Sequence, residues 1–326
     1  MAINGIHNAD MDIDRLAGAA TRRELLASGY TPNDLRRAIR DGAIVRLAAG
    51  VFGPRWIDEA PPEIKHAQLA VAPARGRTGA LARVSAAAVH GLPVWGMRTD
   101  RVHLSARRGG SGTLATSRSV THADPRPAAA VRIDGIEVVG VARTVIDIAR
   151  HESKTAAVVV GDAALHLKRC TLDELLIELE LASGFPGHSR AVRAVSQMNG
   201  LSESPLESRS RVLVVDDPGL PDPDLQVDVV DDSGAFLARG DLAWVDQQVL
   251  GECDGHGKYR GQYGVDPAIA VIREKERTDR LHEAGWRVVR WGWRDLEHPD
   301  RLLARIRRMV LAPPLERRAS ARQGAS

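Results

Sequence analysis

Hydrophobic and polar positions near the start of the chain have the spacing of a short amphipathic helix. The segment TRRELLASG opens with Thr21 and has Glu24 three residues later, the arrangement of a capping box. Gly29 follows the last apolar residue and is suited to end the helix, because glycine readily adopts the left-handed backbone found there. The pattern therefore predicts a helix that begins just after Thr21.

A second helix and a hairpin are predicted directly afterwards. In TPNDLRRAIRDG, Thr31 is the expected N-cap, Pro32 takes the first helical position and Gly42 marks the end. The next segment, AIVRLAAGVFG, alternates and turns like two short antiparallel strands. Two helices joined by a tight turn and followed by a hairpin predict a winged helix-turn-helix over residues 10–55.

The second helix is predicted to have one apolar and one strongly polar face. At 100° per residue, the positions on the apolar side are Leu35, Ala38 and Ile39. The positions within a narrow arc on the other side are Asn33, Arg36, Arg37 and Arg40. Forked guanidinium donors can bind phosphates and base edges, so this face is predicted to contact DNA, with Arg46 of the hairpin as a further phosphate contact. An ordinary solvated helix face is the alternative interpretation.

Residues 60–150 mix helical and strand patterns, and residues 151–200 are predicted to be a helical connector. The segment LARVSAAAVHGLPVW predicts a helix capped by Ser85, with His90 packed at its end. RVHLSA predicts a strand, and GIEVVGVARTVIDIA predicts a strand followed by a helix. The whole chain is therefore expected to be of the α/β (α+β) class.

From residue 201 the pattern becomes helix, three strands, helix, strand. SPLESRSRVLVV predicts a helix with Ser204 as N-cap, and LQVDVVDD, ARGDLAWVD and QVLGECDG predict three strands. DPAIAVIREKERTDRLHEAG predicts a long helix that begins after Asp266 and stops at Gly285, and WRVVRWGW predicts a fourth strand. This domain is expected over 201–312, and the Pro-, Arg- and Ser-rich residues 313–326 are expected to be a disordered tail.

Three carboxylates should meet on one face of this sheet. Glu252 and Asp254 are two residues apart, so they point to the same side of their strand. A two-residue loop at 246–247 would pair Asp241 with Glu252, and a four-residue loop at 246–249 would pair it with Asp254. Both registers bring the carboxylates together, with directly opposite Cβ atoms about 5 Å apart. A three-residue loop would place Asp241 on the other face.

Carboxylates this close repel one another unless a cation compensates them, and oxygen ligands favour Mg²⁺ or Mn²⁺. Asp241, Glu252 and Asp254 are therefore predicted metal ligands for the hydrolysis of phosphodiester bonds. Lys258 is the candidate to stabilise the developing charge, and His256 is a weaker candidate for general base. Glu207 is a further candidate, which could reach the metal from the first helix of this domain, although Ser204 and Glu207 also have the spacing of a capping box.

Charge is distributed unevenly along the chain. Residues 1–150 contain 21 Lys and Arg against 14 Asp and Glu, residues 151–300 contain 17 against 27, and residues 301–326 contain 7 against 1. A basic beginning suits a polyanionic partner, although a solubilising distribution is an equal alternative. Two cysteines far apart, Cys170 and Cys253, and the absence of an apolar run of ~20 residues predict a cytoplasmic protein without a membrane span.

The first half of the chain resembles the AbiEi-type antitoxins of type IV toxin–antitoxin (abortive infection) systems. The resemblance covers most of residues 15–150 and rests on TRRELLASGYTPNDLRRAIRDGAIVRLAAGVFG, VSAAAVHGLPVW and VVGVARTVIDIAR, none of which is a catalytic signature. It implies a DNA-binding winged helix ahead of an α/β domain, and a cognate toxin as a possible partner protein. Proteins of this family often repress their own operon.

Residues 200–312 resemble the Vsr-like endonuclease-related domain of the PD-(D/E)XK superfamily, which is fused to AbiEi-like segments in actinobacteria. GDLAW, GECDGHGKY, REKERTDRL and GWRVVRWGWRDL carry the resemblance. It implies that Asp241, Glu252 and Asp254 bind metal, with Lys258 nearby. The chain departs from the superfamily pattern at Asp254, where lysine is expected.

These observations predict a DNA-binding protein with a metal-dependent endonuclease-like C-terminal domain, used in phage defence or a toxin–antitoxin system. The alternative is a non-catalytic antitoxin or transcriptional repressor. Local pairing of Lys275 with Asp279 is expected on the long helix, and Trp286, Trp291 and Trp293 are expected to be packing residues.

Overall fold

The structure, a computed structural model, describes residues 13, 16–75, 79–106, 113–124, 130–255 and 267–313. It combines helices with mixed sheets, which confirms the α/β class. Contacts divide the chain into two compact units, Met1–Met198 (unit 1) and Asn199–Ser326 (unit 2). No helix among the described residues is both long and apolar enough to cross a bilayer.

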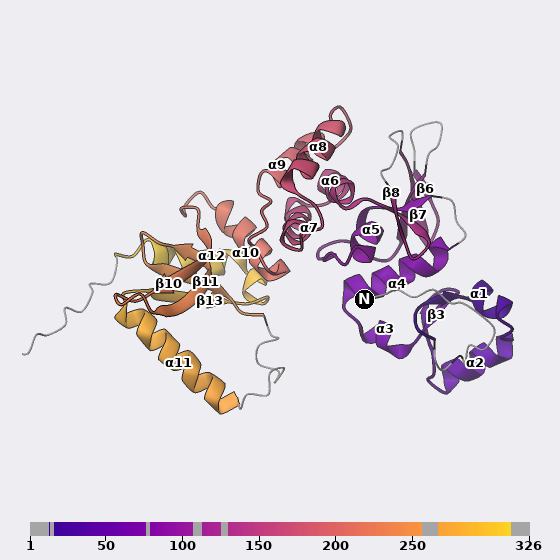
Figure 1. Ribbon diagram of the computed structural model, residues 1–326, viewed down its shortest axis with the longest axis horizontal. Coiled ribbons are helices and arrows are strands. Elements are labelled where there is room, and N and C mark those ends of the chain that lie inside the picture. Colours follow the sequence, from indigo (N-terminus) through magenta and orange to yellow (C-terminus); the bar gives the residue numbers. More distant parts are fainter. Residues whose placement is uncertain are drawn as a thin grey trace, which may run out of the picture. The chain divides into compact units, whose positions relative to one another are not determined.

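Unit 1 begins with a helix pair and a small sheet (Figure 1). The sheet has the order β1-β3-β2, and its neighbouring strands are antiparallel. The elements are β1 (Ala20–Thr21), α1 (Arg22–Ala27), α2 (Pro32–Arg40), β2 (Val45–Ala48) and β3 (Val51–Gly53). The helices, the turn between them and the hairpin thus lie where the sequence pattern predicted them.

Both helices begin at the predicted N-cap residues, Thr21 and Thr31, and each of these residues forms a capping box. Thr21 Oγ1 accepts a hydrogen bond from the Glu24 N–H (3.2 Å), and Glu24 Oε2 accepts one from the Thr21 N–H (2.7 Å). Thr31 and Asp34 repeat this exchange at 3.2 and 2.9 Å. These reciprocal bonds satisfy N–H groups that a helix start leaves without intrahelical acceptors, so the sequence fixes where each helix begins.

The helix pair packs on the next part of unit 1 through a shared core. α3 (Arg55–Glu59) and α4 (Pro62–Ala74) follow β3. Ala19, Val51 and Ala72 are buried in one cluster, and the Ala19 N–H donates to Gln68 Oε1 of α4 at 2.9 Å in a buried hydrogen bond. The small sheet and α4 therefore form one continuous packed body.

A six-stranded mixed sheet with the order β6-β7-β5-β4-β9-β8 occupies the middle of unit 1. Its strands are β4 (Ala80–Leu81), β5 (Val102–Ala106), β6 (Thr113–Ala115), β7 (Ser119–Ala123), β8 (Ala130–Ile133) and β9 (Ile136–Val139). The helices around and after it are α5 (Arg83–Val89), α6 (Val141–His151), α7 (Lys154–His166), α8 (Leu172–Leu181) and α9 (His188–Val195). In Figure 1, α6 to α9 form a helical group beside this sheet.

The prediction that Ser85 caps a helix is wrong. α5 begins at Arg83 with Ala82 as its N-cap, so Ser85 lies inside the helix and is buried. Its hydroxyl oxygen lies 2.9 Å from His66 Nε2 and accepts the His103 N–H at 2.9 Å. His90 is packed at the helix end as predicted, with Nε2 2.8 Å from the Val139 carbonyl oxygen.

Unit 2 has the predicted order of helix, three strands, helix and strand, followed by a helix that the sequence pattern had not indicated. The elements are α10 (Pro205–Val215), β10 (Asp224–Val230), β11 (Phe236–Trp244), β12 (Val249–Cys253), α11 (Pro267–Glu283), β13 (Arg287–Trp291), η2 (Asp295–Glu297) and α12 (Pro299–Val310). The sheet order is β10-β11-β12-β13, with β12 and β13 parallel and the other neighbours antiparallel.

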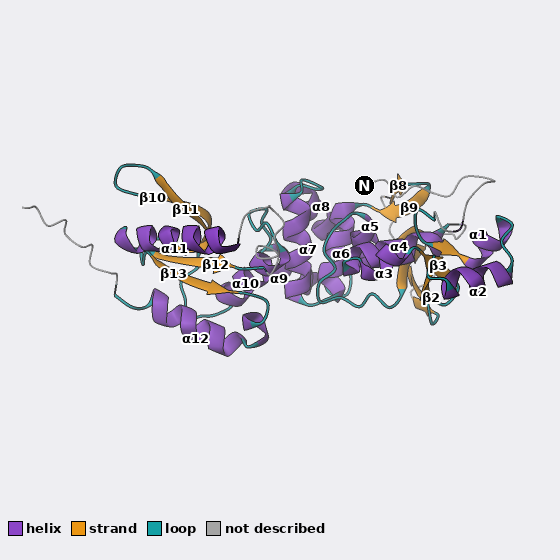
Figure 2. Ribbon diagram, turned by 90° about the horizontal axis from the view of Figure 1, so that it is seen from below, coloured by secondary structure: helices purple, strands orange, loops and turns teal. Residues whose placement is uncertain are grey.

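The sheet of unit 2 lies between α11 on one side and α12 on the other (Figure 2). On the α12 side, Trp244 and Trp291 are buried in a core that includes residues of α10 and α12. Each indole N–H has an acceptor, the Pro221 carbonyl oxygen for Trp244 and Ser210 Oγ for Trp291. Trp286 and Trp293 are partly buried against the two cores, so the tryptophans are packing residues, as predicted.

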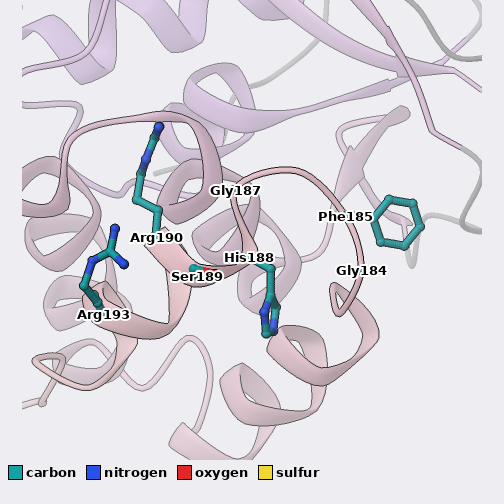
Figure 3. A pocket seen from close by; sticks show the side chains of 7 residues that line it. All are labelled: Gly184, Phe185, Gly187, His188, Ser189, Arg190 and Arg193. Atoms are coloured by element: carbon teal, nitrogen blue, oxygen red, sulfur yellow. The ribbon is translucent and has the colours of Figure 1, made fainter.

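Two glycines of the loop before α9 test how closely this part of unit 1 is packed (Figure 3). Both have positive φ, +76° at Gly184 and +85° at Gly187. A Cβ added at Gly187 would lie 2.2 Å from the Arg150 carbonyl oxygen, whereas a Cβ at Gly184 would meet nothing within 4 Å. We expect Gly184→Ala to lower the free energy of unfolding by about 1 kcal/mol and Gly187→Ala by about 3 kcal/mol, because only the latter also forces backbone apart.

Urea unfolding of the two variants, followed by circular dichroism, measures this difference. Both variants place alanine at a positive φ and therefore have the same backbone penalty. The additional loss of unfolding free energy in Gly187→Ala then measures the steric contact with Arg150. Equal losses for the two variants would contradict the close approach of the loop to α6.

Candidate nucleic-acid interface and carboxylate site

The predicted DNA-contact residues of α2 lie together on its exposed face. Leu35 and Ala38 are buried against Leu25, Ile44 and Phe52, which fixes the orientation of the helix. The side chains left exposed on α2 include Asn33, Arg36, Arg37 and Arg40. The structure therefore groups these four residues as expected.

Ile39 departs from the prediction for the apolar face. It is 39% exposed and stands outside the core formed by Leu35 and Ala38. The buried face of this short helix is therefore narrower than the helical projection indicated, because only part of the apolar arc finds a packing partner.

The arginines of this face differ in the charges that surround them. Arg37 is paired with Asp34 at 2.7 Å, and Arg40 lies 3.5 Å from the Asp41 carboxylate. Hydrogen bonds from Thr31 hold the pKa of the Asp34 carboxyl below its usual value. Arg36 has no ion pair among the described residues. It is therefore the arginine on this face that a phosphate or base edge can engage without displacing a carboxylate.

The strands that carry Asp241 and Glu252, β11 and β12, pair in one of the two registers that the sequence left open. Trp244 pairs with Val249 and Leu242 with Gly251, which is the register of the two-residue loop as far as the residue after Asp241. The turn comprises residues 245–248, rather than 246–247, but it preserves this pairing. Asp241 Oδ2 accepts a hydrogen bond from the Cys253 N–H at 2.7 Å, which holds the carboxylate beside β12.

Glu252 is buried, and both its oxygens accept hydrogen bonds from arginines (the guanidinium clamp, formed by Arg277 and Arg290). Arg277 Nη1 and Nη2 donate to Oε1 and Oε2 at 2.7 and 2.8 Å, and Arg290 Nε donates to Oε2 at 2.7 Å. Glu274 extends the network by accepting from both arginines. Burial disfavours the charged form of Glu252, but the guanidinium groups outweigh it and lower the pKa of this carboxyl.

Asp254 lies just beyond β12. Its N–H donates to the Trp291 carbonyl oxygen at 2.8 Å, and it borders a pocket of about 330 Å³ together with Arg290, Arg294 and Asp295. Two further predicted residues, His256 and Lys258, lie outside the described part of the chain.

Glu207 lies at the start of α10, where the predicted capping box is half formed: Ser204 caps the helix, but the Glu207 carboxylate accepts from the Glu203 N–H and not from the Ser204 N–H. Ser204 Oγ accepts from the Glu207 N–H (3.3 Å), and Glu207 Oε1 accepts from the Ser204 hydroxyl (2.7 Å). Its other oxygen accepts from the Glu203 N–H and from the Gln226 amide. Its hydrogen-bonding capacity is thus used to fasten α10 to β10.

The fit of a divalent metal can be judged from these contacts. No group of three His, Cys, Asp or Glu side chains that could hold a metal ion occurs within the described residues. The charge of Glu252 is already compensated by two guanidinium groups. The arrangement therefore does not fit Mg²⁺ or Mn²⁺ as it stands, and the metal site stays a prediction.

The guanidinium clamp was not predicted because its partners are distant in sequence. Lys275 was expected to pair with Asp279, but no such ion pair occurs among the described residues of α11; Arg277 of the same helix pairs with Glu274 and Glu252. An arginine three residues after a glutamate on the same helix was a weak signal. The pairing of Arg277 with Glu252 depends on the packing of α11 against the sheet, which the local sequence does not indicate.

A second polar cluster, on β5, β7 and α5, was also not anticipated. His103 Nδ1 and His122 Nε2 are 3.1 Å apart, and Arg83 adopts a positive φ of 50°. Burial, followed by the charge of Arg83, lowers the pKa of His103 to about 4 and that of His122 to about 3. Both imidazole rings are therefore neutral at physiological pH and contribute no charge to this polar cluster.

No family model matches the chain. It is 32% identical over 178 residues to "Uncharacterized protein MT2308" of Mycobacterium tuberculosis strain CDC 1551 / Oshkosh and to "Uncharacterized protein Rv2248" of strain ATCC 25618 / H37Rv. The match covers 54% of this chain and 63% of each relative. The chain thus matches less than two thirds of the length of these relatives.

The clamp makes a prediction about pH. Because the folded state lowers the pKa of Glu252 from its ordinary value of 4.5, the stabilisation is present above that value and is lost as pH falls through the folded pKa. We expect Glu252→Gln to lower the free energy of unfolding by about 2 kcal/mol at neutral pH, with a difference from wild type that shrinks in acid.

Urea unfolding of the full chain at neutral and acidic pH provides the measurement. Glu276→Gln is the matched control, since it removes the same charge from an exposed position on α11. An equal loss in both variants, or a loss at Glu252 that does not change with pH, would argue against the clamp.

Proposed function

We propose that this protein binds double-stranded DNA through α2 and the β2–β3 hairpin, which together form a winged helix-turn-helix. The observation that carries the proposal is the exposed face of α2, where Asn33 and the three arginines project from a helix whose opposite side is buried. Such a face supplies charge for phosphates and planar donors for base edges.

The order of the strands supports this interpretation. β1 precedes the helix pair and joins β3, so the hairpin is fixed to the start of α1 rather than attached to the helices by its turn alone. The Arg22 N–H also donates to the Gly50 carbonyl oxygen in the hairpin turn at 2.8 Å. A hairpin held in this way can present Arg46, which is exposed on β2, at a fixed position relative to α2.

For unit 2 we favour a nuclease-like scaffold without a catalytic metal, and we propose that the protein acts by binding, as repressors and antitoxins do. The guanidinium clamp supports this choice, because Arg277 and Arg290 already supply the positive charge that Glu252 requires. A cognate toxin as partner stays a prediction.

Metal-dependent DNA cleavage is the second candidate. It is favoured by the position of Asp241, whose carboxylate accepts a hydrogen bond from the N–H of Cys253, the residue after Glu252 on β12. Plasmid DNA incubated with the purified full chain and Mg²⁺ or Mn²⁺ separates the two candidates. We expect no nicking; nicking by the wild type that Asp241→Ala and Glu252→Ala each abolish would instead assign an endonuclease.

The binding proposal is tested at Arg36. We expect Arg36→Ala to weaken binding to a duplex selected from a randomised pool by about tenfold, because a charge-assisted hydrogen bond to DNA is lost while no ion pair within the protein is disturbed. Fluorescence anisotropy with labelled duplex measures the affinity.

Arg132→Ala is the matched control, since Arg132 is an exposed arginine of β8. Wild-type protein that binds no selected duplex would overturn the proposed function. Arg36→Ala binding as tightly as Arg132→Ala would remove α2 from the interface.

A further inference from the structure

A pocket of about 540 Å³ next to the hairpin of unit 1 gathers five arginines from separate segments (the wing-side arginine cluster). Two come from the start of α1, one from β2, one from the end of α4 and one from the turn before β7. They are Arg22, Arg23, Arg46, Arg75 and Arg118. None of the arginines of α2 lines this pocket, so it is a second basic surface of the same unit.

Backbone contacts hold the parts of this cluster together. The Arg22 N–H donates to the Gly50 carbonyl oxygen at 2.8 Å, and the Val102 N–H donates to the Arg118 carbonyl oxygen at 2.9 Å. A Cβ built on Gly50 would lie 3.7 Å from Arg118 Nη1. The guanidinium group of Arg118, from the six-stranded sheet, therefore lies against the turn of the small hairpin.

The cluster has more positive charge than its surroundings neutralise. Arg75 is paired with Glu24 at 3.3 Å and is half-buried, so it acts as a supporting residue of the pocket wall. The exposed arginines Arg22, Arg46 and Arg118 have no ion pair within the described residues. Several guanidinium groups held close together repel one another, and an anion that bridges them relieves this repulsion.

The lining of the pocket favours a phosphodiester backbone over unstacked bases. Apart from the arginines, the pocket is lined by Thr21, Ala49, Gly50, Val51, Pro73 and Val102, with no aromatic side chain. Proteins that bind single strands generally use aromatic platforms on which bases stack. Exposed arginines beside a glycine suit the phosphates of a duplex, whose bases remain paired.

We propose that the wing-side arginine cluster binds the sugar–phosphate backbone of the DNA duplex contacted by α2. This inference rests on the proposed function and extends the interface beyond the winged helix, to Arg118 of the following sheet. Contacts to phosphate position a protein on DNA without reading its sequence, so the cluster supplies affinity and salt dependence, while α2 supplies discrimination.

Arg46→Ala and Arg118→Ala in the full chain test the proposal. Each is expected to weaken binding to the selected duplex about tenfold. Each should also reduce the slope of log affinity against log salt concentration by about 0.9, the value for one released phosphate contact. The order of preference among duplex sequences should not change. Anisotropy titrations over a salt series give the affinity and slope together.

Arg132→Ala is again the control, because β8 and the β6–β7 hairpin that bears Arg118 lie at opposite edges of the six-stranded sheet. It should leave both affinity and slope at the wild-type values. Arg118→Lys should restore part of the affinity lost in Arg118→Ala, because a lysine also neutralises phosphate. Thermal unfolding that matches wild type shows that a weak variant is folded.

The outcomes separate the two proposals. If Arg36→Ala weakens binding while Arg46→Ala and Arg118→Ala keep the wild-type affinity and slope, the cluster proposal is overturned and the DNA-binding function stands. A change of sequence preference without a change of slope would also overturn it, as would tighter binding to single-stranded DNA or duplex RNA than to duplex DNA. A wild-type protein that binds no duplex would overturn both.

Discussion

A buried carboxylate has to be compensated, and this requirement organises the sheet of unit 2. Glu252 lies on β12, whereas the two arginines that compensate its negative charge come from α11 and β13. Removing water from a carboxylate costs several kcal/mol unless charged partners with good geometry replace it. The pairing therefore ties three elements together and fixes the α11 face against the sheet.

The same requirement limits what the site can do. A divalent cation and a guanidinium group compete for the same carboxylate oxygens, because each supplies the positive charge that burial demands. In this chain the hydrogen bonds from Arg277 are bidentate, which matches the planar geometry of the carboxylate. A metal would have to displace these bonds as well as its own hydration shell. Unit 2 is thus better suited to hold its shape than to bind a cation at Glu252.

The exposed arginines of unit 1 have a different role, because burial does not decide their partner. Arg36, Arg46 and Arg118 are exposed, and within the described residues they have no carboxylate to neutralise them. Exposed guanidinium groups retain their charge for an external anion and pay little desolvation cost before it arrives. This difference between buried and exposed arginines is the reason why the basic beginning of the chain supports the functional proposal.

Features set by neighbours in sequence could be predicted, and features set by tertiary packing could not. Thr21 and Glu24 are three residues apart, so their capping box was evident from the sequence, and β11 and β12 pair in one of the two predicted registers. Arg277 is 25 residues from Glu252, and nothing local indicates that pairing. The wing-side arginine cluster is a stronger case, because phosphate binding requires charges that converge in space. Its arginines come from four segments that are separated along the sequence.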